Sequence, residues 1–305
     1  MLQNSPLLRI LITGAAEKTG LPTNKRKGKD MKTMFVQFIA ILMMLMSNSC
    51  VAYNAKTDFG ANVKQNVSVS DFDELHISSA LHVIYVAGNT PKVTLEGPKD
   101  LLKEIKVEQK GRTLILNRHK QTSHPRKFQK DLTDFVTITV QSPALRSLDL
   151  SGASELKAKQ IRANNDFLLS ISGASELELG TLRCQQMNVS ASGASEVDIN
   201  KTVANHIEWE VSGASQIDLE AVAAHYFQAT LGGASQMDAT LNGVETSGIR
   251  ATGASSGEIH YNRCGSAEVY AGGASSVELS GSLQTLSQST SSSSTIDTRE
   301  LKTAR

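Results

Sequence analysis

The sequence predicts an all-β protein, a right-handed parallel β-helix (β-solenoid) with about 20 residues per coil and an irregular N-terminal cap. Three observations predict it: a repeated Gly-Ala-Ser triplet, alternation of apolar and polar residues around each triplet, and no sustained helical spacing over residues 151–298. The chain has 305 residues, of which 40% are hydrophobic and 20% charged, and its formal net charge is +1. This composition excludes wholesale disorder, and the charge gives no argument for a nucleic-acid partner.

The Gly-Ala-Ser triplet recurs at a nearly constant spacing. Successive glycines are 20 residues apart, except across the first interval of 21. The seven glycines are Gly152, Gly173, Gly193, Gly213, Gly233, Gly253 and Gly273. A degraded eighth copy is expected at Ser291–Asp297 and a weaker early copy at Ile77–Val83. Such self-similarity indicates stacked units that share one core.

Each unit reads as two short strands around a glycine corner. Met187, Val189 and Ala191 alternate with polar residues before the corner, and Val197 and Ile199 do so after it. A further apolar point recurs at Leu182, Val203, Val222 and Leu283. Units this short bury an apolar face by stacking in parallel, about 4.8 Å apart. Parallel crossovers are right-handed. The left-handed hexapeptide helix is the alternative, although 20 is not a multiple of six.

Residues 68–150 are expected to form irregular coils that cap the stack, because an open sheet edge invites further pairing. Lys110-Gly111 is a hairpin signal, and Pro98–Glu104 fits one short helix. Alternation predicts strands at Val83–Val86, Lys92–Leu95, Ile105–Glu108, Arg112–Leu116 and Phe135–Val140.

An apolar run near the N-terminus predicts export. Met34–Met46 is shorter than the roughly 20 residues of a transmembrane helix, and it follows the basic Lys32 as a signal peptide does. We expect translation to start at Met31, with a long basic leader as the alternative. The predicted division is a leader plus signal peptide at 1–52, a linker at 53–67, one solenoid at 68–298 and a tail at 299–305. Within the solenoid, 68–150 form the capping coils and 151–298 the repeats.

Two cleavage sites compete at the end of the signal peptide. Cys50 follows small residues and is a lipidation candidate, the first residue of a lipoprotein, whereas Cys50-Val-Ala52 fits ordinary signal peptidase. Either site places the mature chain in the periplasm, at the outer membrane as a lipoprotein or at the cell surface. Membrane contact is expected only through the lipid anchor or the signal peptide.

The segment Phe72–Leu116, the motif Val140-x-x-Pro143-x-Leu145 and the Ser-Gly-Ala-Ser units resemble the family called putative auto-transporter adhesin, head GIN domain. The resemblance covers about residues 68–298. It implies a β-helix, secretion or lipid anchoring in a Gram-negative bacterium and a role in adhesion, and it carries over no catalytic residues.

Stacked coils turn acidic residues into outward columns. Lys157 begins one column, which continues with Glu178, Asp198, Asp218, Asp238, Glu258 and Glu278. A second column, two residues earlier, holds Glu155, Glu176, Glu196, Gln216, Gln236, Ser256 and Ser276. Because Ca²⁺ takes clustered carboxylate oxygens, the six carboxylates of the first column are the candidate metal site. A solvated face that keeps the solenoid soluble is the alternative.

The repeat argues against an enzyme. Paired carboxylates about 5–9 Å apart hydrolyse glycosides, but any two neighbours in the column meet that distance, and no Lys, Arg or His interrupts the acids from Glu178 to Glu278. No cofactor is expected apart from the candidate Ca²⁺. The triplet serines are expected to point inward as a hydrogen-bonded hydroxyl ladder: Ser154, Ser175, Ser195, Ser215, Ser235, Ser255 and Ser275.

Cys184 and Cys264 lie four coils apart, about 19 Å at the strand spacing, which is too far for a disulfide. We expect both to be free, buried and inert. The basic stretch from Arg118 to Lys130 is expected to be a solvated loop, with contact to an anionic glycan or a membrane surface as the alternative.

The sequence therefore predicts a non-catalytic cell-envelope or secreted β-solenoid that acts as an adhesin or surface-interaction domain. Its expected partner is a surface glycan or a protein ligand, and no nucleic acid. A structural spacer in an envelope assembly and, less favoured, a polysaccharide-acting enzyme are the alternatives.

Overall fold

The structure, a computed structural model, describes residues 60–119 and 135–304. The predicted signal peptide, Cys50 and the basic stretch beyond His119 lie outside the described residues. Among the described residues, no helix is long and apolar enough to cross a membrane.

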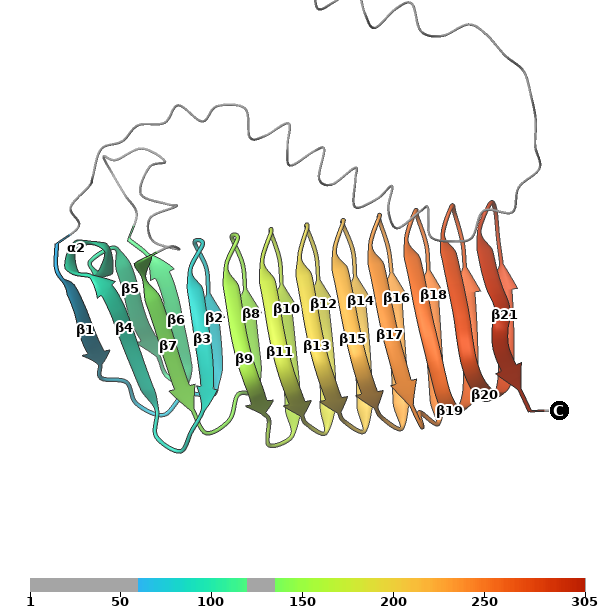
Figure 1. Ribbon diagram of the computed structural model, residues 1–305, viewed down its shortest axis with the longest axis horizontal. Coiled ribbons are helices and arrows are strands. Elements are labelled where there is room, and N and C mark those ends of the chain that lie inside the picture. The colour runs from blue at the N-terminus through green and yellow to red at the C-terminus, as the bar shows by residue number, and fades with distance from the viewer. Residues whose placement is uncertain (1–59, 120–134, 305) are drawn as a thin grey trace, which may run out of the picture. The chain divides into compact units, whose positions relative to one another are not determined.

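The repeat region is a parallel β-solenoid, as the sequence predicted (Figure 1). Each coil places one strand in each of two stacks, and each strand pairs in parallel with its counterpart one coil away. One stack contains β8 (Ser147–Leu150), β10 (Asp166–Ile171), β12 (Gln186–Ala191), β14 (His206–Val211), β16 (Tyr226–Leu231) and β18 (Thr246–Ala251). The other contains β9 (Glu155–Arg162), β11 (Glu176–Arg183), β13 (Glu196–Val203), β15 (Gln216–Ala223) and β17 (Gln236–Asn242).

The last coils keep this arrangement with longer strands. β19 (Ser256–Ala271) and β20 (Ser276–Thr290) each bend through a coil and pair in both stacks. β21 (Thr295–Thr303) pairs with the first half of β20 and ends the described chain. It occupies most of the segment predicted to be a tail, because its backbone continues the ladder beyond residue 298.

The N-terminal coils change from parallel to antiparallel pairing. β2 (Glu74–Ile77) and β3 (His82–Ala87) extend the two stacks. β6 (Thr113–Arg118) is parallel to β2 and forms an antiparallel hairpin with β5 (Ile105–Lys110). β7 (Thr137–Ser142) is parallel to β3 and antiparallel to β4 (Lys92–Pro98), which is followed by the short helix α2 (Lys99–Leu102).

The outermost N-terminal strand is β1 (Asn62–Val67), which pairs with β4 antiparallel. It lies inside the segment predicted to be a linker. The sequence did not predict this strand, because β1 is mostly polar and shows no clear alternation of apolar and polar residues. Only Val63 and Val67 are partly buried.

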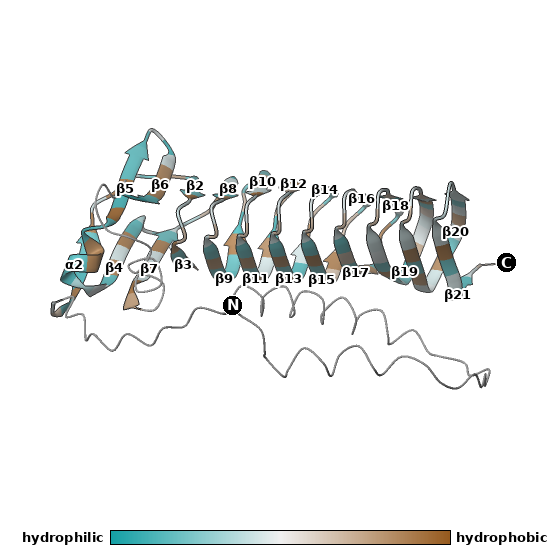
Figure 2. Ribbon diagram, turned by 90° about the horizontal axis from the view of Figure 1, so that it is seen from above, coloured by the Kyte–Doolittle hydropathy of each residue, from teal (hydrophilic) through white to brown (hydrophobic). Residues whose placement is uncertain are grey.

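The core lies between the two stacks and is built from the buried residues of their strands. Figure 2 shows the corresponding apolar and polar bands along the strands. Along one column of core residues, a large side chain lies between smaller ones, so the volume is filled evenly. Trp209, which is 1% exposed, lies between Val189 and Ala229. The third apolar point is occupied by the buried Leu182, Thr202 and Val222, which lie in register. The prediction of Val203 was therefore wrong by one residue.

The glycine corners form a second ladder, made of backbone. Gly213 has a φ of +74°, and a Cβ there would lie 2.3 Å from the carbonyl oxygen of Gly193 one coil earlier. That oxygen accepts a 2.7 Å hydrogen bond from Ala214 N–H. Glycine is required both by the left-handed backbone and by this close approach. A similar contact recurs at Gly193, Gly233, Gly253 and Gly273.

The two imperfect copies also form corners, as the sequence predicted. Ser79 has a φ of +70°, and the neighbouring Ala80 donates its N–H to the Gly152 oxygen. Ser292 has a φ of +62°, and Ser293 donates to the Gly273 oxygen. Serine therefore replaces glycine at the first and last corners.

The triplet serines are buried, as predicted, but they do not mainly bond one another. The hydroxyl of Ser215 donates to the carbonyl of Ser212 at 2.9 Å, inside the same corner. The six other triplet serines make the same contact three residues back. Each buried hydroxyl therefore has a hydrogen-bond partner inside its own corner.

The extra residue of the 21-residue interval sits at a corner. Arg162 pairs with Arg183, a separation of 21 residues, whereas Asp166 pairs with Gln186, a separation of 20. The additional residue is therefore absorbed between Arg162 and Asp166, and both strand ladders stay in register.

Candidate functional site

The outward side chains form two faces of different character. The acidic face carries the outward residues of β3, β9, β11, β13, β15, β17, β21 and the first halves of β19 and β20. The variable face carries those of β2, β8, β10, β12, β14, β16, β18 and the second halves of β19 and β20.

The predicted acidic column is in register. Successive pairings join Glu178 to Glu278 through Asp198, Asp218, Asp238 and Glu258. Asp297 continues the column at the C-terminal end. A shallow hollow of about 370 Å³ lies over the last four predicted carboxylates, between Asp218 and Glu278.

Ion pairs occur at both ends of this face. At the C-terminal end, Arg299 Nε donates to the two oxygens of Asp297 at 2.9 and 2.8 Å. The Lys157 ammonium lies 2.7 Å from Glu178 and 3.2 Å from Glu155, and both contacts raise its pKa. In the neighbouring column, burial and then the charges of Glu155 and Glu196 raise the pKa of Glu176. Stacked carboxylates thus oppose each other's ionisation.

The acidic column has no arrangement typical of a metal site. In residues 60–119 and 135–304, no group of three or more His, Cys, Asp or Glu side chains is placed to hold a metal ion. Binding of Ca²⁺ by the six carboxylates stays a prediction.

The two cysteines of the solenoid are free, as predicted. Cys264 is buried and its thiol lies 3.3 Å from the Leu241 carbonyl oxygen. Cys184 is only half-buried, contrary to expectation, and packs against the edge of the core. Burial, followed by the charge of Asp166, still raises the pKa of Cys184 to about 11, which keeps the thiol protonated and unreactive.

The variable face breaks the repeat, and the sequence analysis missed it. Its central column changes residue type at almost every coil: Ser147, Leu168, Asn188, Glu208, Gln228, Gly248, Glu268 and Ser287. The column beside the corner holds Gln186, His206, Tyr226, Thr246, Ser266 and Thr285. The sequence does carry a signal for this face. The residue type varies at the positions five and seven residues before each triplet glycine, although the fold alone does not require it to vary.

Aromatic side chains lie on the variable face. The rings of His206 and Tyr226 stack with centroids 4.5 Å apart and planes 14° from parallel. Two coils further on, the Arg250 guanidinium lies 4.7 Å from the centre of the Tyr270 ring. The Tyr270 hydroxyl is 2.9 Å from the hydroxyl of Ser291. These contacts hold polar and aromatic groups in fixed positions on a regular sheet.

Hollows occur along the variable face. One of about 390 Å³ extends from Tyr226 to Ser287 and is floored by Gly248. Another of about 440 Å³ surrounds Leu168, which is 51% exposed, and reaches Glu210. A third, of about 530 Å³, shares Leu168 and continues to the N-terminal strands.

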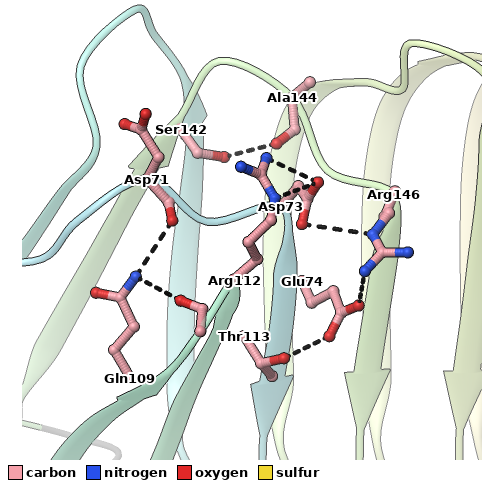
Figure 3. A network of polar contacts seen from close by, with 10 residues as sticks. Asp71, Asp73, Glu74, Gln109, Arg112, Thr113, Ser142, Ala144 and Arg146 are labelled. Atoms are coloured by element: carbon pink, nitrogen blue, oxygen red, sulfur yellow. Dashed lines mark hydrogen bonds and ion pairs between the residues drawn. The ribbon is translucent and has the colours of Figure 1, made fainter.

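A polar network borders the third hollow and ties three strands together (Figure 3). Arg112 donates to Asp73 through Nε at 3.0 Å and Nη2 at 2.8 Å, and Arg146 Nε lies 3.4 Å from the other oxygen of Asp73. Arg146 also pairs with Glu74, which accepts a hydrogen bond from Thr113. Burial alone would raise the pKa of Asp73, but the two arginines outweigh it and hold that pKa below its usual value.

Comparisons with solved structures find the same fold. A structure from Parabacteroides distasonis ATCC 8503, described as a putative adhesin, has a TM-score of 0.63 and 16% identity, covering 78% of this chain and 97% of that chain. A putative adhesin from Bacteroides fragilis NCTC 9343 has a TM-score of 0.55 and 18% identity, covering 78% of this chain and 96% of that one. A second Parabacteroides distasonis structure, described as a putative lipid binding protein, has a TM-score of 0.55 and 16% identity, covering 78% and 96%.

No curated protein matches the chain. The family model described as "Putative auto-transporter adhesin, head GIN domain" matches residues 71–262. That range includes the antiparallel strands β4 and β5 and most of the repeats but not β1, and it agrees with the resemblance seen in the sequence. The chain therefore belongs to the putative auto-transporter adhesin, head GIN domain family.

Proposed function

We propose that this chain is an exported, non-catalytic surface-interaction protein that binds its ligand through the variable face. The observation that carries the proposal is the contrast between the two faces. The acidic face repeats a carboxylate at six successive coils of its column, which serves solubility, whereas the central column of the variable face changes chemical type at successive coils. Variation on a fixed scaffold is how binding sites are built.

The chemistry of the variable face suits binding better than catalysis. Its hollows are shallow and lie on a sheet whose backbone N–H and C=O groups are already paired with neighbouring strands. A ligand therefore meets a row of neighbouring polar side chains on this face. A catalytic site instead brings a nucleophile or a general acid and base together in a concave pocket. The family description as an adhesin supports the same role. A spacer in an envelope assembly would not need an irregular face.

Export from the cytoplasm is part of the proposal. An adhesin acts outside the cytoplasm, and the apolar run Met34–Met46 with Cys50 after it supplies a route of export.

The test is an adhesion assay with a matched pair of variants. The full chain is attached to beads, and the retention of the beads on cultured epithelial cells is counted. Thr246→Arg places a long cation on the variable face, and Gln216→Arg places the same side chain on the acidic face; both positions are exposed. We expect Thr246→Arg to abolish most retention and Gln216→Arg to leave it unchanged. Equal retention of the two variants would contradict binding through the variable face.

A further inference from the structure

We propose that the hollow beside Tyr226 is a carbohydrate site, in which a neutral sugar ring stacks on the open face of Tyr226. This inference rests on the proposed function and names the class of ligand for the variable face.

A stack of aromatic rings on the variable face ends at Tyr226. His206, Tyr226 and Thr246 are consecutive members of one column, so His206 and Thr246 lie on opposite sides of Tyr226. The ring planes of His206 and Tyr226 are nearly parallel, with centroids 4.5 Å apart. The second face of the Tyr226 ring is therefore turned toward Thr246, whose short side chain cannot cover it. The column continues with the equally small Ser266 and Thr285.

Gly248, in the central column of the variable face, leaves space beside Tyr226. Its φ is not positive, so the backbone does not demand glycine there. A Cβ at this position would lie 2.2 Å from Oε1 of Gln228, which means that the Gln228 amide leans across the glycine. The resulting hollow of about 390 Å³ lies at the lower end of the range for small-ligand sites, about 300–1,000 Å³.

Polar groups surround this space. Tyr226 Oη donates to Gln228 Oε1 at 2.9 Å, which fixes the amide. The amide nitrogen of Gln228 has no partner among the described residues, and the same is true of the exposed Glu268 carboxylate. A donor and an acceptor thus flank an open aromatic ring.

A sugar matches this combination. The C–H face of a pyranose packs on an aromatic ring, which carries partial negative charge on its face. Its hydroxyls both donate and accept, so they pair with Glu268 and Gln228 respectively. The carboxylates of Glu268 and Glu208 disfavour an anionic ligand, while Arg250 already lies against Tyr270. A peptide that adds to a sheet needs a free strand edge, and β16 and β18 are paired on both sides.

The experiment measures binding of the full chain to an array of neutral and sialylated oligosaccharides, with each signal confirmed by titration calorimetry of the free oligosaccharide. We expect neutral oligosaccharides to bind. Tyr226→Ala and Gly248→Gln should weaken binding at least about tenfold. Tyr226→Phe keeps the ring but loses the hydrogen bond that fixes the Gln228 amide, so it should weaken binding less than Tyr226→Ala does. The matched control is Ser256→Gln, which adds the same side chain to the acidic face. Fluorescence of Trp209 checks that each variant is folded.

The proposal is overturned if no neutral oligosaccharide binds, if only sialylated ones bind, or if Tyr226→Ala and Gly248→Gln bind as the wild type does. The bead assay separates this result from the proposed function. Beads that adhere equally to untreated cells and to cells whose glycans are oxidised with periodate would refute the carbohydrate site and leave adhesion intact.

Discussion

Replacement of the corner glycine at position 213 gives a direct measure of how tightly the coils are stacked. Gly213→Ala places a methyl group 2.3 Å from the Gly193 oxygen, whereas ordinary van der Waals contact begins at 3.4 Å. Gly243→Ala is the matched control, because Gly243 also has a positive φ, +64°, but nothing lies within 4 Å of its Cβ position. The two variants share the strain of a left-handed alanine and differ in the clash.

The magnitudes follow from these contacts. A left-handed alanine costs about 1–2 kcal/mol, which is the whole effect expected for Gly243→Ala. In Gly213→Ala the coils must also separate at the corner. This weakens the 2.7 Å hydrogen bond from Ala214 to the Gly193 oxygen and the equal one from Ala234 to the Gly213 oxygen. At about 0.5–1.5 kcal/mol each, these losses make Gly213→Ala about 1–3 kcal/mol more destabilising than the control.

The assay is urea unfolding followed by the fluorescence of Trp209, the single tryptophan of the chain. Trp209 is buried in β14, four residues before Gly213, so it reports on the coil that is perturbed. Because coils in a solenoid interact mainly with their neighbours, a nearby probe is needed. If the two variants unfold at the same urea concentration, the close backbone contact does not govern stability and the reasoning fails.

Three further predictions concern other contacts. Asp198→Asn removes one charge from the acidic column, where the repulsion between neighbouring carboxylates is below about 1 kcal/mol in water. The urea concentration at the unfolding midpoint should therefore rise at low salt. If this gain persists in about 1 M NaCl, repulsion is not its cause. Arg112→Met should lower the urea midpoint slightly at neutral pH, because an exposed ion pair with Asp73 stabilises the fold only weakly. Because the pKa of Asp73 is held below 3.8, that loss should vanish as the pH falls through the folded value; a pH-independent loss in urea titrations would rule out the ion pair. Ser215→Ala should lower the free energy of unfolding by about 1 kcal/mol, because the Ser212 carbonyl loses the hydrogen bond from the buried hydroxyl. An unchanged urea midpoint would mean that water replaces the hydroxyl.

The repeats made the solenoid predictable because a fixed spacing of 20 residues places like residues over like. The same logic located the imperfect corners at Ser79 and Ser292, where the backbone conformation survives without glycine. In the N-terminal part, alternation located the strands β3 to β7, but with no 20-residue repeat there it gave no guide to how they pair. β1 and β4 pair antiparallel, and β1 carries few apolar residues, so only long-range contacts reveal it.

The candidate site was harder to predict for a physical reason. A repeat draws attention to positions that stay the same, such as Asp198 and Asp218, and those positions maintain the stack or its solubility. Binding depends on positions that differ, such as Tyr226 and Gly248. Their significance appears only when the register shows that the ring of Tyr226 ends a stack and that Gln228 leans over a gap.

The corner between Arg162 and Asp166 bears on how such proteins change in length. One surplus residue is taken up there without disturbing either ladder, whereas the same insertion inside a strand would turn every following side chain to the opposite side. Duplication or loss of a whole 20-residue unit likewise preserves the direction of each side chain. Related solenoids can therefore differ widely in length while they present the same binding surface. The corners are also the positions at which a foreign segment can be inserted without disturbing the strands.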